Sequence, residues 1–396
     1  MDWSGIPDHA ARNLDALQIE IPSWGFANTG TRFGKFLQPG AATSLREKFA
    51  DASEVQALTG ATPRVALHVL WDLPNGAADV PEVRRLEAQY GIHAGSINPN
   101  LFQNQEYKLG SICNPDPGIR QMAIDHLIDS VEMAKALGSA DISVWLADGS
   151  NYPGSQSIRK RIFWMEEALI LTHDRMREDQ RLLIEYKPFE PAFYHTDIAD
   201  WGMAVHLART AGPQARVLVD TGHHYQSQNI EQVVAWLLHL RLLGGFHFND
   251  RRYADDDLVI GSIDPYQVFR IFHEILNEPD PAVTADIAFM IDQSHNLKGK
   301  MEAMVQTVMI AQELFLKAAL VDREQLSQLQ AAGKIVEAEE CLRSAFWTDV
   351  RPGLEEWRVS RALPPNPLRA LRESGYVERI SRERATRNAA QLSTYA

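Results

Sequence analysis

Short apolar runs recur along the chain, separated by longer segments with helical periodicity. Eight of these runs are rich in β-branched and aromatic residues, as strands are. They cover residues 18–22, 64–70, 92–97, 141–146, 181–186, 216–220, 244–248 and 286–292. Several are apolar almost throughout, which is typical of strands buried on both faces of a parallel sheet. The pattern therefore predicts a series of β/α units.

The clearest of the intervening helices is predicted over residues 121–138. Its apolar residues at the i, i+3, i+4, i+7 spacing are Ile124, Leu127, Ile128 and Val131. Gly138 is a natural C-terminal stop. Eight such units predict a (β/α)8 TIM barrel. A doubly wound sheet would need a glycine-rich phosphate turn after the first strand, and residues 22–36 contain no G-x-G-x-x-G, so we prefer the barrel.

The chain has 396 residues. An α/β barrel commonly uses about 250 residues as one domain, so this length does not require a second one. Beyond about residue 325 the sequence becomes helical and charged, and it turns irregular at residues 361–367. We predict a barrel with an N-terminal segment over residues 1–324 and a C-terminal helical extension over residues 325–396.

Polar side chains gather where the last four predicted strands end. Active sites of TIM barrels lie at these carboxyl ends, so polar residues there are candidates for chemistry. The candidates are Glu185 and Lys187 after the fifth strand, Asp220 and His223 after the sixth, His247 on the seventh, Asp255, Asp256 and Asp257 in the following loop, and Asp292 at the end of the eighth. Burying so many carboxylates together without a cation would be very costly. Their convergence predicts a divalent ion, and oxygen ligands with imidazoles suit Mn²⁺, Mg²⁺ or Co²⁺ better than a thiolate zinc site.

Each of these features has a purely structural interpretation. The three consecutive aspartates are typical of a solvated loop. His247 on an apolar strand can be a hydrogen-bonded core residue, and Glu185 and Lys187, two apart on one strand, can form an ion pair. Asp220 also suits an Asx-turn at a strand end. An accidental alignment of all four strand ends is much less probable than any one of them, so the combination favours a metal site.

Composition narrows the function further. A formal net charge of −13 opposes extended contact with nucleic acid or anionic lipid. Cys113 and Cys341 are the two cysteines of the chain, far apart, and indicate neither a disulfide framework nor a thiolate metal site. The N-terminus lacks the basic and apolar regions of a secretory signal, and no stretch approaches 18 apolar residues. These features predict a soluble, cytoplasmic protein that has neither nucleic acid nor a membrane as a partner.

The order of these motifs resembles a known family. E-x-K, D-x-x-H, a strand-borne His, D-x-D and a final Asp follow one another as in the xylose-isomerase-like barrels. The phrases IEYKPFEPAFYHTD, VDTGHH, GGFHFNDRRYADDD and MIDQSHN resemble more closely the L-rhamnose isomerases of the broad-specificity bacterial type. The resemblance extends over roughly residues 15–320 and weakens in the C-terminal extension.

The resemblance implies two neighbouring divalent ions, most simply Mn²⁺, with Co²⁺ or Mg²⁺ as alternatives. It assigns Glu185, Asp220, His247 and Asp292 to a first, structural ion that fixes two adjacent sugar hydroxyls. It assigns Asp220, as a bridge, with His223, Asp255 and Asp257 to a second, catalytic ion. The commoner isomerase pattern has a longer carboxylate in place of Asp220 and a carboxylate in place of His247, which leaves the metal preference open.

Further roles are implied by the same resemblance. Lys187 would stabilise an oxyanion at the carbonyl end of an open-chain sugar, His68 would handle the ring oxygen during opening, and Asp292 would join them as a catalytic residue. Trp71 and Trp145 would form apolar walls. Phe33 or Phe36 would reach into a neighbouring subunit of a homotetramer, although a loop Phe that covers its own barrel is an equally good interpretation.

The predicted activity is a metal-dependent interconversion of L-rhamnose and L-rhamnulose, with broad aldose specificity. A 1,2-hydride shift is favoured because no unpaired Glu presents itself as a general base. The main alternative is a ketose 3-epimerase, which uses two opposed glutamates around one metal, where this chain has Trp145 and Asp292. A DNA-directed phosphodiesterase is disfavoured by the net charge, and a non-catalytic sugar-binding barrel by the completeness of the ligand set.

Overall fold

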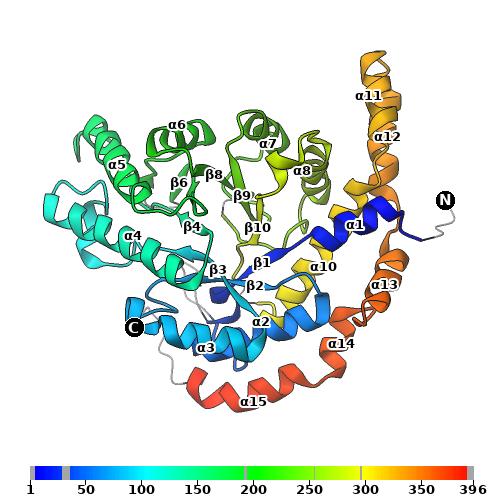
Figure 1. The fold of residues 1–396 in the computed structure, drawn as a ribbon, viewed down its shortest axis with the longest axis horizontal. Helices are drawn as coiled ribbons and strands as arrows, with labels where there is room; N and C mark the ends of the chain where they lie inside the picture. Colours follow the sequence, from blue (N-terminus) through cyan, green and yellow to red (C-terminus); the bar gives the residue numbers. More distant parts are fainter. Residues whose placement is uncertain (1–4, 29–35, 191–193, 254, 295–296, 390–396) are drawn as a thin grey trace.

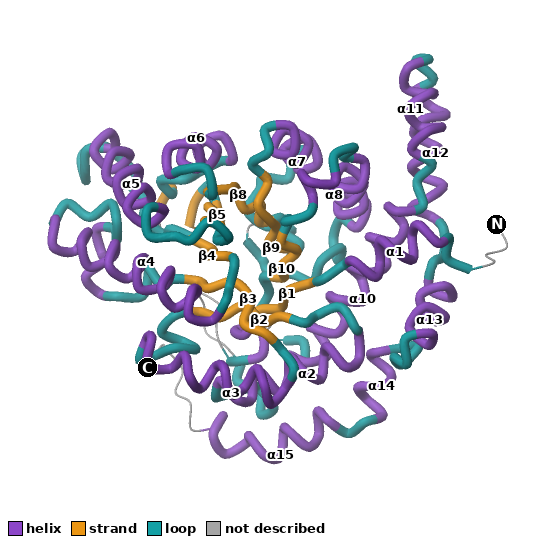
Figure 2. Tube along the Cα trace, in the orientation of Figure 1, coloured by secondary structure: helices purple, strands orange, loops and turns teal. Residues whose placement is uncertain are grey.

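The computed structural model describes residues 5–389 apart from 29–35, 191–193, 254 and 295–296. Eight parallel strands form a closed barrel in the order β1-β10-β9-β8-β5-β4-β3-β2, with helices around it (Figures 1 and 2). The barrel strands are β1 Ile19–Pro22, β2 Arg64–His68, β3 His93–Asn98, β4 Asp141–Val144, β5 Arg181–Glu185, β8 Ala215–Asp220, β9 Leu243–Phe248 and β10 Ala288–Ile291. Each coincides with one of the eight predicted runs, so the TIM-barrel prediction is confirmed.

Helices follow the strands and cover the outside of the barrel. The α-helices are α1 Asp8–Ala16, α2 Leu45–Thr59, α3 Val80–Tyr90, α4 Pro117–Leu137, α5 Ile158–His173, α6 Trp201–Ala211, α7 Ile230–His239, α8 Pro265–Asn277, α9 Pro281–Thr284, α10 Lys300–Ala319, α11 Arg323–Ala331, α12 Ile335–Trp347, α13 Arg351–Ser360, α14 Pro367–Glu373 and α15 Tyr376–Ala389. Short 3-10 helices occur at η1 Ser23–Phe26, η2 Gly76–Asp79 and η3 Gln105–Leu109. A small antiparallel hairpin of β6 Phe189–Glu190 and β7 Tyr194–His195 follows β5, and the sequence pattern did not predict it.

Local signals explain where the predicted helix at residues 121–138 begins and ends. The Asp116 side chain accepts hydrogen bonds from two free backbone N–H groups of the first turn, and Pro117 occupies the first helical position. The helix therefore starts four residues earlier than the apolar pattern alone predicts. It ends at Gly138, whose φ of 72° favours glycine because that residue has no Cβ to clash.

The barrel interior is apolar in one layer and polar in the next. Leu183, Leu218 and Met290 form a buried cluster inside the barrel, from three different strands. Toward the carboxyl ends, Asp220 of β8 lies opposite His247 of β9 in the parallel ladder, and Glu185 is the last residue of β5. The apolar layer thus closes the floor beneath a polar pocket, as it does in other TIM barrels.

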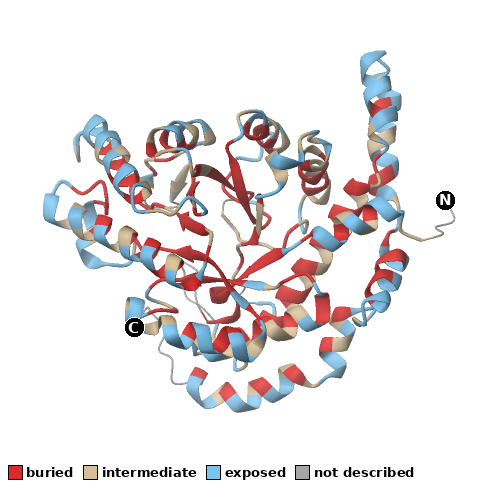
Figure 3. Ribbon diagram, viewed as in Figure 1, coloured by how far each residue is buried: buried red, intermediate tan, exposed pale blue. Residues whose placement is uncertain are grey.

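The C-terminal helices divide into two groups. Helices α11 and α12 project away from the barrel and are largely exposed, whereas α13 to α15 run along its outside (Figures 1 and 3). The second group is held by buried contacts, since Arg358 donates to Gln312 of α10, and both Tyr376 and Arg384 donate to Asp51 of α2. The predicted helical extension is therefore present, while the proposed division at residues 324 and 325 stays a prediction.

Within the described ranges, no single helix is long and apolar enough to cross a membrane. Only α10 and α11 together reach that length and composition, and they meet at a 57° bend.

Candidate metal centre and substrate pocket

Four buried side chains meet at the carboxyl ends of β5, β8 and β9. Glu185 lies at the centre, with Oε1 3.2 Å from Nδ1 of His223 and Oε2 3.2 Å from Nδ1 of His247. Asp220 lies on the other side of His223, at 3.9 Å from its Nε2. All four side chains are at least nine-tenths buried. Residues separated by up to 62 positions in the sequence are thus brought together, as the strand-end pattern predicted.

The turn after β8 explains the segment VDTGHH. The Asp220 carboxylate accepts hydrogen bonds from the backbone N–H of Gly222 at 2.7 Å and from Nδ2 of Asn249 at 3.0 Å. A Cβ on Gly222 would lie 2.4 Å from Oδ1 of Asn249, so only glycine fits there. His223 faces the cluster, whereas His224 turns away, and its Nε2 lies 2.7 Å from the hydroxyl of Tyr186. The two adjacent histidines therefore belong to different environments.

The aspartate run after β9 also divides. Asp255 lies in the cluster, with Oδ1 3.4 Å from Nε2 of His223 and Oδ2 2.7 Å from Nζ of Lys187. Asp256 instead accepts hydrogen bonds from the backbone N–H groups of Arg252 and Tyr253 at 2.5 and 2.7 Å. Asp257 has a φ of 48°, a strained value for a non-glycine residue, and its carboxyl group is hydrogen-bonded to Asp255.

Asp292 follows β10 and completes the cluster. Its Oδ2 lies 3.9 Å from Nδ1 of His247, and its Oδ1 accepts a 2.9 Å hydrogen bond from Nε1 of Trp24. Its side chain is 28% exposed, more than those of Glu185 and Asp220, so it lies toward the open side of the pocket.

Protonation in this cluster follows from burial and crowded negative charge. Burial opposes charging of His223, yet Asp220 and Asp255 raise its pKa to about 9. Burial likewise opposes charging of His247, but Glu185 and Asp292 raise its pKa to about 10. Burial raises the pKa of Asp220 to about 7, and the neighbouring carboxylates add to that shift. Without a bound cation, the protein must therefore hold protons to neutralise this pocket.

Several observations test whether the residues fit a divalent ion. Glu185, Asp220 and His223 each offer a ligand atom, and these atoms lie within 4.8 Å of one another. Asp220, His247 and Asp292 form a second group of the same kind, so Asp220 is shared by both. The buried Nδ1 of His247 has no well-directed hydrogen bond to any described residue, which is unusual for a core histidine. The donor set of carboxylate oxygens and imidazole nitrogens fits a divalent metal ion.

An aromatic wall borders the cluster on the side of β2 and β4. His68, the last residue of β2, stacks on Trp71 with ring centroids 3.7 Å apart, and the Phe102 ring meets His68 and Trp71 edge-on. Trp145 follows β4 and contacts Phe102, with centroids 5.0 Å apart. Nζ of Lys187 lies 5.2 Å from the Trp145 ring centre. Consecutive contacts thus link the predicted substrate residues His68, Trp71, Trp145 and Lys187, through Phe102.

Contacts of the Asp72 carboxylate fix the turn that carries His68 and Trp71. Asp72 accepts hydrogen bonds from Ser23 and from the backbone N–H of His68, and its carboxylate pairs with Lys48 at 2.5 Å. Between His68 and Trp71, Leu70 has a φ of 76°, a strained value for a branched residue. Burial lowers the pKa of His68 to about 4, so its ring is neutral at pH 7.

The roles predicted for the two loop phenylalanines stay predictions. Phe33 lies outside the described residues, and the Phe36 side chain is 71% exposed.

Three residues that the sequence interpretation missed do border the site, namely Trp24, Phe102 and Asn249. Asn249 follows β9 directly, so its position at a strand end was a usable signal.

A larger hollow, of about 1180 Å³, lies at the opposite end of the barrel, where the strands begin. Two of its buried carboxylates already have partners, since Asp141 accepts two 2.8 Å hydrogen bonds from Arg181, and Glu20 accepts from the backbone and side chain of Ser96. The cluster at the carboxyl ends is therefore the better candidate for chemistry.

The fold and this cluster define an α/β barrel whose carboxylates and imidazoles converge at the carboxyl ends of its strands. A sequence model described as the xylose isomerase-like TIM barrel matches residues 55–278. The chain belongs to this family, which confirms the broader of the two resemblances found in the sequence. The narrower one, to L-rhamnose isomerases, stays a prediction.

Individual relatives agree with this assignment. The chain is 37% identical over 399 residues to a probable sugar isomerase of Rhizobium meliloti, covering 97% of this chain and 92% of that protein. It is 36% identical over 391 residues to a probable sugar isomerase of Mesorhizobium japonicum, covering 97% and 90%. A D-allulose 3-epimerase structure from Methylomonas superposes with a TM-score of 0.52 at 15% identity, covering 80% of this chain and all of that one. At that identity, the likeness shows a shared fold.

Proposed function

We propose that this protein is a divalent-metal-dependent aldose–ketose isomerase that interconverts L-rhamnose and L-rhamnulose and accepts other aldoses of similar configuration at C2 and C3. The observation that carries the proposal is the position of Asp220, which belongs to two adjacent groups of potential ligands. Two neighbouring ions that share one carboxylate suit a substrate with adjacent oxygen atoms. The two relatives described as probable sugar isomerases support the same reaction class.

In this proposal, with the sets that the resemblance implies, Glu185, Asp220, His247 and Asp292 would hold the first ion, and Asp220, His223, Asp255 and Asp257 would hold the second. Bound ions would orient adjacent hydroxyls of an open-chain sugar and polarise its carbonyl group. Mn²⁺ is the ion we propose, with Co²⁺ or Mg²⁺ as substitutes, because the imidazole nitrogens of His223 and His247 move selectivity away from Mg²⁺.

Lys187 provides a fixed positive charge next to these groups. Its ammonium is buried, points at the Asp255 carboxylate and lies above the face of Trp145. A cation that is already oriented before reaction stabilises charge that develops on the carbonyl oxygen of the sugar. Lys187 is therefore proposed as a catalytic residue that binds this oxygen.

His68 has the geometry of a proton acceptor for ring opening. Its Nδ1 lies 2.9 Å from the backbone carbonyl of Val69, and only an N–H can bond to that oxygen. Nδ1 therefore carries the proton, and Nε2 presents its lone pair. Because the pKa of His68 is lowered to about 4, the ring is neutral and able to accept a proton from a sugar hydroxyl.

The aromatic wall gives the pocket a dry side. Trp145 presents its ring face to Lys187, and Phe102 and Trp71 continue this wall, along which carbon-bound hydrogens of a sugar can lie. Exclusion of water favours direct transfer of hydrogen between C1 and C2 over proton exchange through solvent. A 1,2-hydride shift is therefore the proposed route.

The localisation and the subunit number of the enzyme are proposed from composition and from the resemblance. Composition suits the cytoplasm, and the resemblance to L-rhamnose isomerases suits a homotetramer in which Phe33 reaches a neighbouring pocket. Cross-linking and sedimentation of the purified protein test the subunit number.

A substrate panel tests the reaction. The protein is saturated with Mn²⁺ and incubated separately with L-rhamnose, L-lyxose, L-mannose, D-allose and D-allulose, and the products are separated by chromatography. The proposal predicts ketoses from the aldoses, fastest from L-rhamnose. Conversion of D-allulose into its C3 epimer without isomerisation of any aldose would replace the proposal with a ketose 3-epimerase.

A further inference from the structure

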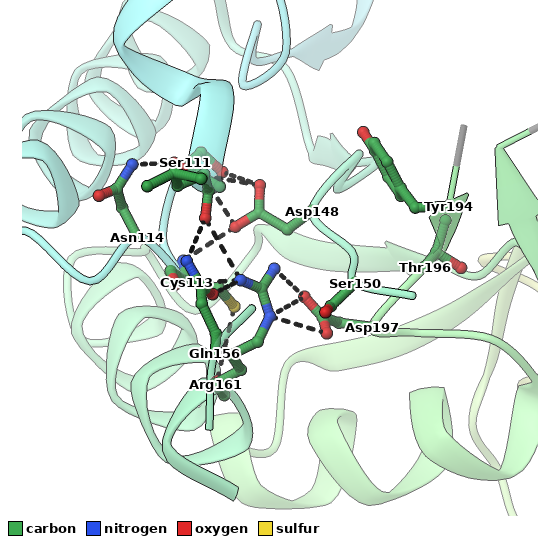
Figure 4. Close-up of polar contacts among 12 residues, drawn as sticks. Ser111, Cys113, Asn114, Asp148, Ser150, Gln156, Arg161, Tyr194, Thr196 and Asp197 are labelled. Carbon is green, nitrogen blue, oxygen red and sulfur yellow. Dashed lines mark hydrogen bonds and ion pairs between the residues drawn. The ribbon is translucent and has the colours of Figure 1, made fainter. Parts of the chain in front are cut away.

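A buried arginine joins two of the loops at the carboxyl ends of the barrel strands. Arg161 of α5 is 1% exposed, and its Nε and Nη2 donate to the carboxylate of Asp197 at 2.9 and 2.6 Å (Figure 4). Its Nη1 donates to the backbone carbonyls of Leu109 and Cys113, in the loop after β3. One guanidinium thus binds the loops that follow β3 and β5.

Asp148, in the loop after β4, completes this network. Its carboxylate accepts hydrogen bonds from the backbone N–H groups of Ser111 and Cys113, each at 2.8 Å, and from the Ser111 hydroxyl at 2.7 Å (Figure 4). Cys113, Asp148 and Asp197 are close enough to suggest a metal site. The cation of this cluster is the guanidinium of Arg161, however, and burial keeps the Cys113 thiol protonated by raising its pKa. We therefore interpret the cluster as an ion-pair network.

The segment that Arg161 holds is hydrogen-bonded to the backbone of Lys187. The two neighbours of Asp197 make these bonds. The Thr196 hydroxyl donates to the backbone carbonyl of Lys187, and the backbone N–H of Lys187 donates to the carbonyl of Ile198 at 2.9 Å. Asp197 itself donates its backbone N–H to the carbonyl of Asp148 at 2.9 Å. The position of the Lys187 backbone thus depends on a segment that is fixed through the side chain of Asp197.

The same segment holds the loop that begins with Trp145. The Tyr194 hydroxyl donates to the carbonyl of Ala147, and the backbone N–H of Ser150 donates to the carbonyl of His195 at 2.9 Å. Trp145 and Lys187 are in contact through the ring face and the ammonium group. Both sides of this contact therefore rest on residues 194–198.

We propose that the Arg161–Asp197 pair is a positioning pair that fixes Lys187 and Trp145 relative to each other for the reaction. The inference rests on the proposed function of Lys187, because it adds a supporting residue to that role. Arg161 does not touch the pocket and acts through residues 196–198. A shift of about 1 Å in a group that binds the reacting atoms can lower turnover by about 100-fold, so such a support is significant for catalysis.

A purely structural role of the Arg161–Asp197 pair makes a different prediction. A matched control is available on β5, the strand that precedes Lys187. Arg181 at the start of β5 makes a bidentate, largely buried pair with Asp141, at the opposite end of the barrel from Lys187. If burial of an ion pair alone matters, Arg161→Met and Arg181→Met should have the same effects on stability and turnover. If Arg161 positions Lys187, only Arg161→Met should impair turnover.

The experiment compares wild type, Arg161→Met, Arg161→Lys, Asp197→Asn and Arg181→Met, each loaded with Mn²⁺. For each variant, bound metal, kcat and KM for the fastest aldose, and hydrogen–deuterium exchange of peptides over residues 187 and 194–198 are measured. We expect Arg161→Met and Asp197→Asn to keep the wild-type metal content and to lose about 10- to 100-fold in kcat, with KM within about threefold. Hydrogen–deuterium exchange of residues 194–198 should accelerate in both variants. Arg161→Lys should recover part of the kcat lost in Arg161→Met. Arg181→Met should match wild type in kcat and in the exchange of residues 194–198.

Two results would overturn the inference. One is a kcat within about twofold of wild type in a folded, metal-loaded Arg161→Met or Asp197→Asn protein, since misplacement of Lys187 must be visible in turnover. The other is unchanged exchange of residues 194–198. If wild type isomerises no aldose, the proposed function fails, and the exchange comparison by itself then decides whether Arg161 fixes the segment next to Lys187. If Arg161→Met does not fold, Asp197→Asn, which keeps the side-chain shape, decides the question.

Discussion

The ammonium nitrogen of Lys187 lies 2.7 Å from Oδ2 of Asp255, and both side chains are more than nine-tenths buried. Burial opposes ionisation of Asp255, but His223 and Lys187 outweigh it and hold the pKa of this carboxyl well below its usual value. Lys187 therefore compensates a proposed metal ligand and lies next to the proposed carbonyl site at the same time. A divalent ion at Asp255 would take over the first task and leave Lys187 available for the second.

Removal of this ammonium should separate binding from turnover. We expect Lys187→Met to keep the wild-type metal content and to lose at least about 100-fold in kcat, as when one donor to a developing oxyanion is removed. Metal is measured by plasma mass spectrometry and kcat with the fastest aldose. Near-normal turnover would show that Lys187 is merely the ion-pair partner of Asp255.

Replacement of Asp220, the carboxylate shared by the two proposed ions, should change the stability of the fold in opposite directions with and without metal. Asp220→Asn removes one negative charge from a crowded cluster, so the metal-free variant should be at least as stable as metal-free wild type. In Mn²⁺ it should lose the stabilisation that wild type gains, which is about 3 kcal/mol at 100 times Kd. Thermal unfolding with and without Mn²⁺ measures both effects, and Asp286→Asn, on an exposed residue before β10, is the control. Two ions still bound to Asp220→Asn would exclude a bridging role.

The fate of the substrate hydrogen tests the dry aromatic wall. In D₂O, a direct transfer between C1 and C2 leaves the ketose product free of solvent deuterium. An aldose labelled with deuterium at C2 should yield a ketose with the label at C1. Nuclear magnetic resonance of the product reads both positions, and extensive incorporation from D₂O would indicate an enediol route with a general base.

Acid should destabilise the protein through a histidine remote from the pocket. His273 of α8 is 6% exposed, and burial, followed by the charge of Arg323, lowers its pKa to about 4. The folded-state pKa lies below the unfolded value of about 6.5, so on acidification the unfolded protein binds a proton at His273 before the folded protein does. The stability of the fold is therefore unaffected by His273 above pH 6.5 and decreases as the pH falls from 6.5 toward 4. At pH 5 the loss amounts to about 2 kcal/mol.

Urea unfolding at pH 7 and pH 5 measures this contribution. We expect a smaller loss of stability between the two pH values in His273→Gln than in wild type, and His206→Gln on the surface is the matched control. Equal losses in wild type and His273→Gln would refute the assignment to His273.

The barrel could be predicted from the sequence because its physical signals are local. A strand such as residues 216–220 has an apolar middle, Val217–Val219, that is buried on both faces, and a helix such as α4 carries its own cap at Asp116 and its own stop at Gly138. The cluster at the strand ends could be predicted for a related reason. Once the barrel is assumed, Glu185, Asp220 and His247 must converge, because the carboxyl ends of parallel strands share one edge.

Other parts of the site depend on contacts that sequence spacing does not encode. Trp24 reaches Asp292 across 268 residues, through a 3-10 turn that has no periodic signal. The Arg161–Asp197 pair was missed because neither residue lies at a strand end. A signal did exist, since Arg161 lies on the buried face of α5 together with Met165 and Ala168, where an arginine requires a partner.

The central claim is that Asp220 joins two ions in a catalytic pocket, and a metal titration tests it most directly. Protein stripped by a chelator is titrated with Mn²⁺ while bound metal and isomerisation of L-rhamnose are followed in the same samples. The account predicts no turnover without metal, two ions bound per chain at saturation, and full activity only when both are bound. Full turnover by the stripped protein, or saturation at a single ion, would contradict it.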